Sequence, residues 1–303
     1  MSGSSIAALA LVAGMAPLMP ALSGRTVAFL TGRRGAPLLQ PYRDLVKLLG
    51  KGAVYSRATT WLFRLAPAGV LGTALVAAFL LPLDGRAALT GFAGDMIAFT
   101  GLLALGRLLL VLAGLDTGSS FEGMGASREL GFSSFTEPAL FLCLGALALV
   151  TGELSLGRAL GAPLAQGWVH APASLAMVSV SLFVVLLAEA SRGPVDDPAT
   201  HLELTMIHEA TILDHGGPDL GLLLYASALK FALFGAIVAG LLLPRAGWPA
   251  PFAVAALVPG LAAVAVLVGV IESIMARLRL VQVPQLLAGA AALAALGVIL
   301  RVG

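Results

Sequence analysis

The chain contains few charged residues for its length. Asp, Glu, Lys and Arg make up 11% of its 303 residues, whereas 59% are hydrophobic and the mean hydropathy is +0.98. A soluble domain has about a quarter of its residues charged. This shortage excludes a soluble protein and predicts an all-α polytopic membrane protein.

Cysteine is nearly absent too, since Cys143 is the only one. An iron–sulfur cluster needs about four thiolate ligands and a disulfide needs two, so this chain can form neither by itself. A dinucleotide fingerprint and a phosphate loop are also missing, because the glycines at Gly123 and Gly125 lack a flanking strand. We therefore expect no cofactor on this chain and place any electron transfer in a partner.

Long apolar runs, in contrast, are abundant. A membrane span needs roughly 20 apolar residues. We predict eight transmembrane helices in one domain, over residues 4–22, 61–82, 95–114, 136–151, 172–189, 219–243, 250–271 and 284–301. The first is interpreted as a retained span rather than a signal peptide, because Arg25 follows it instead of preceding it.

Basic residues are divided unequally between the two sides of these spans. Four lie on one side: Arg86, Arg158, Arg245 and Arg301. Twelve lie on the other: Arg25, Arg33, Arg34, Arg43, Lys47, Lys51, Arg57, Arg64, Arg128, Arg192, Arg277 and Arg279. The positive-inside rule then predicts cytoplasmic loops at about 23–60, 115–135, 190–218 and 272–283, with both termini outside a prokaryotic inner membrane.

The first of these loops carries an amphipathic pattern from Leu38 onward. Leucines and Tyr42 recur at helical spacing while basic residues occupy another face, which predicts a helix lying along the membrane interface. Two interpretations remain open, a basic anchor on anionic lipid and a docking surface for a cytoplasmic partner. The predicted docking residues are Arg34, Gln40, Arg43, Asp44 and Lys47, with Asp116 and Arg128 from the second loop.

The second loop leads to Glu137, which precedes Pro138. Proline is tolerated at a helix start, so we expect the fourth span to begin here. Glu137 then either compensates the helix dipole or belongs to a functional site.

The third loop follows Glu189, an acidic residue at the end of an apolar run. A carboxylate in that position is costly, which makes it a candidate functional group. Asp197 and Pro198 have the form of a helix start, and the next helix would carry His201 and His208 on one face. Their spacing is not that of a zinc motif and a third ligand is lacking, so we expect a water-lined vestibule rather than a metal site.

Two charges lie deep inside predicted spans, Arg107 and Lys230. Snorkelling does not easily carry a mid-span charge to the surface, so both should face the bundle interior and pair with acids. Such mixed pairs are suited to exchanging protons near neutral pH. A stand-alone ion transporter would show similar buried charges, but the clear half-to-half repeat common among transporters is missing.

Two groups of residues carry a family resemblance over most of the chain. They run from Arg34 through Gln40-Pro to Asp44 and Lys47, and from Glu189 through Arg192, Pro194, Asp196 and Pro198 to Glu203. This pattern resembles the complex I membrane subunit that abuts the quinone site. The stretches Arg107–Ser119 and Gly125–Glu129 are more similar to the homologous subunit of group 4 nickel–iron hydrogenases, of the formate hydrogenlyase and hydrogenase-4 type.

The resemblance implies a non-redox subunit of an oxidoreductase complex that links a peripheral arm to proton or sodium translocation. The implied partners are hydrogenase-like large and small subunits, an iron–sulfur protein and antiporter-like membrane subunits, with iron–sulfur clusters and a nickel–iron centre in those partners. The implied ion path comprises Glu137, Glu189, Asp196, Glu203, Glu209, Arg107, Lys230 and Arg192. His201 and Asp197 depart from the complex I pattern and argue against a conventional quinone pocket, although a quinone-site subunit remains the alternative.

Overall fold

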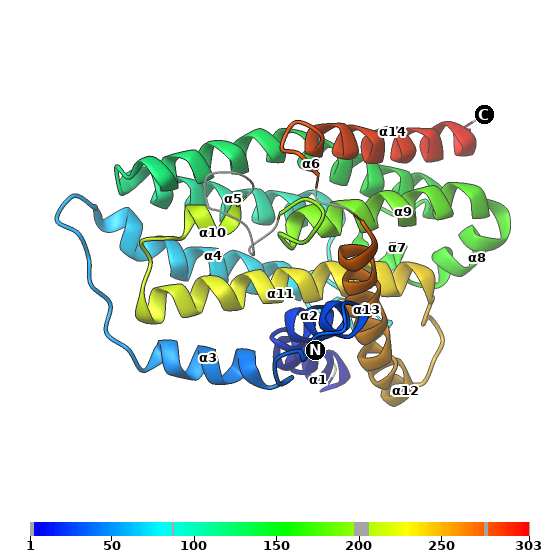
Figure 1. Ribbon diagram of the computed structural model, residues 1–303. Coiled ribbons are helices and arrows are strands. Elements are labelled where there is room, and N and C mark those ends of the chain that lie inside the picture. Colours follow the sequence, from blue (N-terminus) through cyan, green and yellow to red (C-terminus); the bar gives the residue numbers. More distant parts are fainter. Residues whose placement is uncertain (1–2, 87, 197–205, 276–277, 303) are drawn as a thin grey trace.

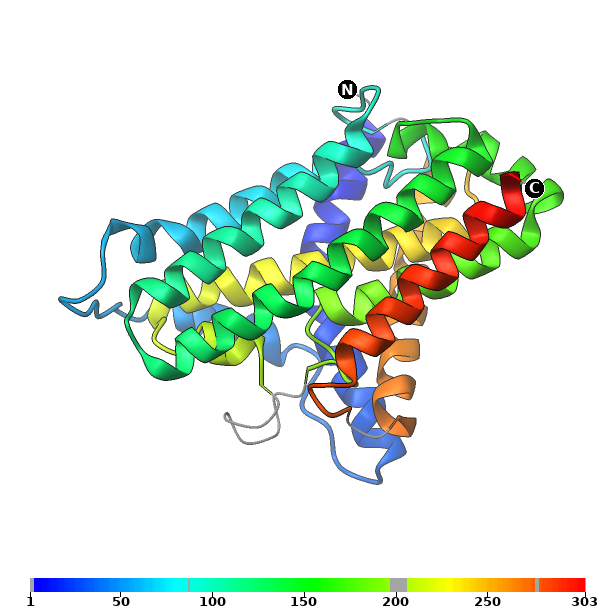
Figure 2. The same cartoon turned by 90° about the horizontal axis from the view of Figure 1, so that it is seen from above.

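The described part of the protein contains α-helices and no β-strand (Figures 1 and 2). The computed structural model describes residues 3–86, 88–196, 206–275 and 278–302. Its helices are α1 (Gly3–Met15), α2 (Leu18–Leu30), α3 (Gln40–Leu49), α4 (Trp61–Phe79), α5 (Asp95–Asp116), α6 (Ser120–Thr151), α7 (Leu156–Ala159), α8 (Ala162–His170), α9 (Pro172–Glu189), α10 (His208–Thr211), α11 (Gly217–Leu242), α12 (Ala250–Ala255), α13 (Leu257–Ile274) and α14 (Val283–Val302). The predicted all-α membrane fold is confirmed.

Within these residues, seven helical segments are long and apolar enough to cross a membrane. They are α4, α5, α6, α9, α11, the α12–α13 unit and α14. The bent pair α1 and α2 makes an eighth if it is counted as one span. The protein is thus a multi-pass membrane protein.

The first span differs from the single helix predicted over 4–22, because it bends by 45° between α1 and α2 and continues to Leu30. Pro17 lies at the break and has no N–H to donate to the Ala13 carbonyl. Tyr225 of α11 donates its hydroxyl to that carbonyl at 3.0 Å, and Tyr42 of α3 donates to the neighbouring Gly14 carbonyl. Two side chains from distant elements therefore stabilise the bend.

The second loop, expected over 115–135, is largely helical, so that prediction was wrong. Helix α6 has 32 residues and contains Pro138 in its interior rather than at its start. At about 1.5 Å per residue it is roughly 48 Å long, against a hydrocarbon core of about 30 Å. Its polar N-terminal half remains helical because partners satisfy it: Glu129 pairs with Arg107 at 3.2 Å, and Arg128 donates to the Met206 carbonyl at 2.9 Å.

Helix α11 occupies the centre of the bundle and is the most buried of the membrane-spanning candidates (Figure 1). Helices α9 and α14 pack side by side through paired hydrogen bonds. Ser174 donates to the Gly297 carbonyl, and Ser181 donates to the Ala290 carbonyl at 2.6 Å. The two serines and the two acceptors are each seven residues apart and run in opposite order, which fixes the antiparallel register of the pair.

Both chain ends lie at one end of the bundle. Ser4 and Ser5 donate to Asp84 in the loop after α4, at 2.9 and 2.8 Å. Arg301 lines a cavity with Thr151 of α6 and His170 of α8. Helices α2, α5 and α9 end at the opposite end of the bundle, and the candidate site lies near their C-terminal ends.

Candidate functional site: an arginine–carboxylate cluster and its cavities

Three glutamates from two helices converge on one buried arginine. Arg107 of α5 contacts Glu129 at 3.2 Å and Glu137 at 2.7 Å, both from α6, and it also pairs with Glu189 at the end of α9. Arg107 is 7% exposed and Glu189 is 4% exposed. The structure therefore brings together Arg107, Glu137 and Glu189, which lie in three separate predicted spans.

The cluster contains more acidic than basic groups. One guanidinium faces three carboxyl groups, and the Glu189 Oε2 atom is buried without a hydrogen-bond partner. Lys230 of α11 lies within electrostatic range of Glu189, but among the described residues it has no carboxylate within 4.0 Å. The three carboxylates therefore share one guanidinium, and Lys230 provides the next positive charge near Glu189.

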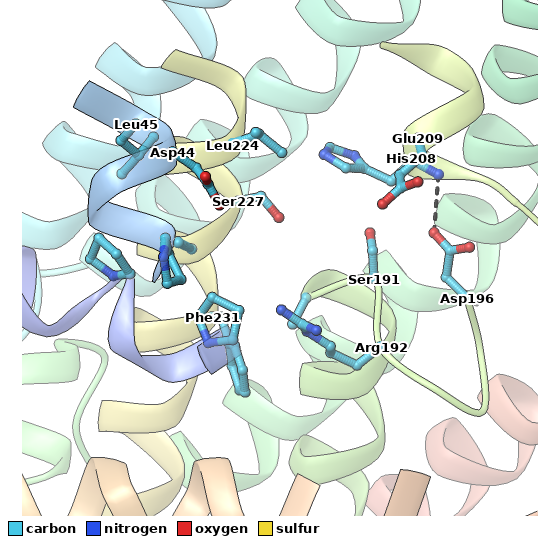
Figure 3. A pocket seen from close by; sticks show the side chains of 15 residues that line it. Asp44, Leu45, Ser191, Arg192, Asp196, His208, Glu209, Leu224, Ser227 and Phe231 are labelled. Atoms are coloured by element: carbon cyan, nitrogen blue, oxygen red, sulfur yellow. Dashed lines mark hydrogen bonds between the residues drawn. The ribbon is translucent and has the colours of Figure 1, made fainter. Parts of the chain in front are cut away.

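A cavity of about 240 Å³ lies beside the cluster, between α2, α3, α11 and the segments around α10 (Figure 3). Ser191, Arg192, Asp196, His208 and Glu209 line one side of it, and Asp44, Leu45, Leu224, Ser227 and Phe231 line the other. The guanidinium of Arg192 lies over the Phe231 ring at 5.5 Å. The cavity is therefore polar on the loop side and largely apolar on the α11 side.

Asp196 connects the polar side of this cavity to α10. Its carboxylate accepts hydrogen bonds from the backbone N–H groups of Ile207 and His208, both at 3.1 Å. Burial raises the pKa of Asp196 to about 6, a change that those two bonds oppose and that Glu129 and Glu209 reinforce. A carboxyl group with this pKa changes its protonation state close to physiological pH.

The pKa of His208 is shifted in the opposite direction. Burial and, to a smaller extent, the positive charges of Lys230 and Arg192 together lower its pKa to about 4. Its Nε2 atom is buried without a hydrogen-bond partner. His208 is therefore neutral near physiological pH, and its Nε2 atom is available to form a hydrogen bond within the site.

A small cavity of about 20 Å³ joins Asp196 to the cluster. Arg107 and Glu129 line one part of it, and Ser191, Asp196 and Ile207 line another. This volume holds about one water molecule, and polar and apolar side chains both line it. Ser191 and Asp196 line the larger cavity as well, so these two residues lie between that cavity and Arg107.

The predicted docking residues are divided by the structure into two groups. Arg34, Arg43 and Lys47 are exposed, and Gln40 donates to Asp44 at 2.8 Å within α3. Asp116 instead accepts from the backbone N–H of Thr60 at 2.7 Å, and Arg128 donates to Met206. The last two therefore stabilise the chain's own loops.

Some site residues were missed or lie outside the described part. Glu129 was not among the predicted ion-path residues because its segment was interpreted as a loop; on a helix, Glu129 and Glu137 are eight residues apart and share a face. Glu209 lines the larger cavity. The predictions for Asp197, Pro198, His201 and Glu203 fall outside the described residues. Of the predicted helix from 201 to 210, the described residues contain α10, His208–Thr211.

Comparison with known proteins agrees with this architecture. The model of a family described as NADH dehydrogenase matches residues 4–302. The chain belongs to this family. Its relatives include formate hydrogenlyase subunit 4 of Escherichia coli (strain K12), 32% identical over 93% of this chain and 92% of that protein.

Two further relatives represent both branches of the resemblance. Hydrogenase-4 component C of Escherichia coli (strain K12) is 33% identical over 76% of this chain and 71% of that protein. A subunit of the NADH-quinone oxidoreductase of Burkholderia vietnamiensis (strain G4 / LMG 22486) is 26% identical over 75% of this chain and 65% of that protein. The family resemblance drawn from the sequence is confirmed.

A solved structure supports the fold alone. It is described as the membrane-bound sulfane sulfur reductase, an archaeal respiratory membrane complex. One of its chains aligns with a TM-score of 0.81 at 20% identity, covering 98% of both chains. The arrangement of helices around Arg107 therefore occurs on a fold used in a respiratory membrane complex.

Proposed function

We propose that this protein is the membrane-anchoring and ion-coupling subunit of an energy-converting hydrogenase-type complex. It links redox chemistry in a peripheral arm to the movement of H⁺ or Na⁺. The observation that carries the proposal is the series of ionisable groups at this end of the bundle: Asp196 lines both the loop-lined cavity and the small cavity that reaches Arg107, which pairs with Glu129, Glu137 and Glu189.

The chemistry of this cluster is proton exchange between carboxyl groups that share one guanidinium. Glu189 shares Arg107 with two other carboxylates, so a change of charge at one carboxylate alters the proton affinity of the others. A change of charge or position near Asp196 or α10, caused by the peripheral arm, would then shift protons into or out of the cluster. Lys230 on α11 provides the next positive charge for lateral ion transfer.

The partners follow from the family. Relatives are named as components of formate hydrogenlyase and hydrogenase-4, so we expect peripheral hydrogenase-like subunits with iron–sulfur clusters and a nickel–iron centre. The basic loops at the site end of the bundle would face the cytoplasm, with both termini on the other side of the inner membrane. Metal analysis of the intact, detergent-purified complex tests this assignment, because nickel in a co-purifying subunit identifies the hydrogenase branch.

A second candidate function is that of a quinone-site subunit in a complex I-type dehydrogenase. The apolar wall of the 240 Å³ cavity, with Leu224, Ala228 and Phe231, favours it. Quinone-dependent turnover by the purified complex would distinguish it from the hydrogenase type.

The coupling role is tested with Glu189→Gln in the reconstituted complex. Glutamine keeps the size of the side chain but cannot ionise. We expect electron transfer to persist and ions moved per electron to fall by roughly tenfold or more, since a positioned proton-transfer group contributes about 10²-fold or more.

Glu153→Gln is the matched control, because Glu153 pairs with the exposed Arg158 at 3.6 Å, far from the cluster. It should leave the ratio of ions to electrons unchanged. An unchanged ratio in Glu189→Gln would refute the coupling role.

A further inference from the structure

A second, larger cavity lies further along α2, toward the C-terminal end of that helix. Its volume is about 610 Å³, within the range of about 300–1,000 Å³ that small-molecule sites occupy. The last turns of α2, the segment after it, the loop after α9 and the end of α13 line it. The previous site uses Asp196 and Arg192 at its boundary, but none of the other lining residues.

The cavity has an excess of guanidinium groups. Arg33, Arg34 and Arg192 line it together with two carboxylates, Asp196 and Glu272, which leaves one net positive charge. Within the described part of the chain, neither Arg33 nor Arg34 has a carboxylate within 4.0 Å. The Arg192 Nε atom is buried and lacks a hydrogen-bond partner. These donors are arranged for an anion that the chain itself does not provide.

Two exposed apolar side chains lie next in sequence to residues that line the cavity, Phe29 beside Ala28 and Ile274 beside Ser273. Phe29, at the end of α2, is 81% exposed, and Ile274, at the end of α13, is 74% exposed. Both helices belong to membrane-spanning segments, so these side chains lie where the apolar slab meets water. A soluble anion would leave these two side chains exposed, whereas acyl chains would cover them.

Helices α2 and α13 pack closely at one end of the cavity. Helices α2 and α13 touch at Gly269, where an added Cβ would lie 2.6 Å from the Ser23 carbonyl oxygen. One turn later, Ser273 already lines the cavity. The two helices therefore enclose a wedge that narrows toward the membrane interior and widens toward the basic segment after α2.

We propose that this wedge binds one phospholipid with a single net negative charge, its phosphate held by Arg33 and Arg34 and its acyl chains covering Phe29 and Ile274. Arginine suits the task because its planar fork donates two parallel hydrogen bonds to a phosphate. Basic pockets between transmembrane helices are known to bind such headgroups. The lipid would brace the loop after α9, which carries Arg192 and Asp196, against α2.

The test uses the intact complex purified in mild detergent and native mass spectrometry of this subunit. The probes are phosphatidylglycerol, phosphatidylethanolamine and inorganic phosphate. We expect the wild type to retain one phosphatidylglycerol, and the variant R33Q/R34Q to bind it roughly 30-fold more weakly, since each arginine near a lipid surface contributes about fivefold. The control K51Q/R57Q removes the same charge from exposed positions of the same loop and should bind as the wild type does.

Further outcomes also decide the question. If R33Q/R34Q does not assemble, R33K/R34K keeps the charge but loses the fork and should weaken retention by a smaller factor. Equal retention in R33Q/R34Q and the wild type would overturn the proposal. Displacement of the lipid by millimolar inorganic phosphate would show a free-anion site instead, and a photo-crosslink from position 33 to a protein segment would show a docking site.

Discussion

The close packing of α10 against α6 predicts that the substitution Gly125→Ala destabilises the protein. Gly125 of α6 faces α10, and an added Cβ would lie 2.6 Å from the Thr211 backbone nitrogen and 2.9 Å from the Ala210 carbonyl carbon. Real Cβ atoms essentially never come this close to backbone atoms. Gly125→Ala must therefore displace α10, which carries His208.

The magnitude follows from two opposing terms. Overpacking in a tight core costs about 1–3 kcal/mol, whereas alanine in place of glycine inside a helix gains about 1 kcal/mol. Gly123, two residues earlier, has nothing within 4 Å of an added Cβ, so Gly123→Ala receives only the gain. We expect the two variants to differ by roughly 2 kcal/mol in the free energy of unfolding.

Thermal unfolding of the purified complex measures the difference, and hydrogen exchange at residues 206–211 locates it. Gly125→Ala should unfold at a lower temperature than the wild type and exchange faster around α10. Gly123→Ala should unfold at the same or a higher temperature with unchanged exchange. A Gly125→Ala variant as stable and as protected as Gly123→Ala would refute the close packing of α10.

Three further predictions concern charge. The pKa of Asp196, raised to about 6, makes the fold less stable as pH rises from about 4 to 6, whereas the pKa of His208, lowered to about 4, makes it more stable over about 4 to 6.5. Asp196→Asn removes the falling contribution of Asp196, so the unfolding temperature of this variant should rise relative to that of the wild type across that window; parallel profiles would contradict this. Lys230→Met should block lateral ion transfer while electron transfer persists at a reduced rate, and Lys230→Arg should fail nearly as badly because arginine keeps its proton; full pumping in Lys230→Arg would make Lys230 a fixed charge. Arg43→Ala combined with Lys47→Ala should release the peripheral subunits on blue-native gels, because both side chains are exposed on α3; a complete complex would assign them to lipid anchoring.

Composition and apolar run length were enough to predict the membrane class, because a bilayer demands about 20 apolar residues per span and little else. The same rule failed where polar residues continue a helix. Residues 120–135 have the composition of a loop, yet they form the first half of α6, since Arg107 and the Met206 carbonyl satisfy Glu129 and Arg128 from outside the segment. The bend at Pro17 was missed for a similar reason, because Tyr42 and Tyr225 satisfy its free carbonyls from two distant helices.

For the site, the sequence by itself determined which residues are too costly to leave without partners. Arg107, Lys230 and Glu189 stand out because ionisable groups within apolar runs need compensation. Only the tertiary structure decided how they are compensated. Glu129, Glu137 and Glu189 meet at Arg107 because α5, α6 and α9 pack together, and Asp196 reaches α10 because a loop returns to the bundle. These contacts join residues 12 to 82 positions apart and depend on tertiary packing, which no local pattern encodes.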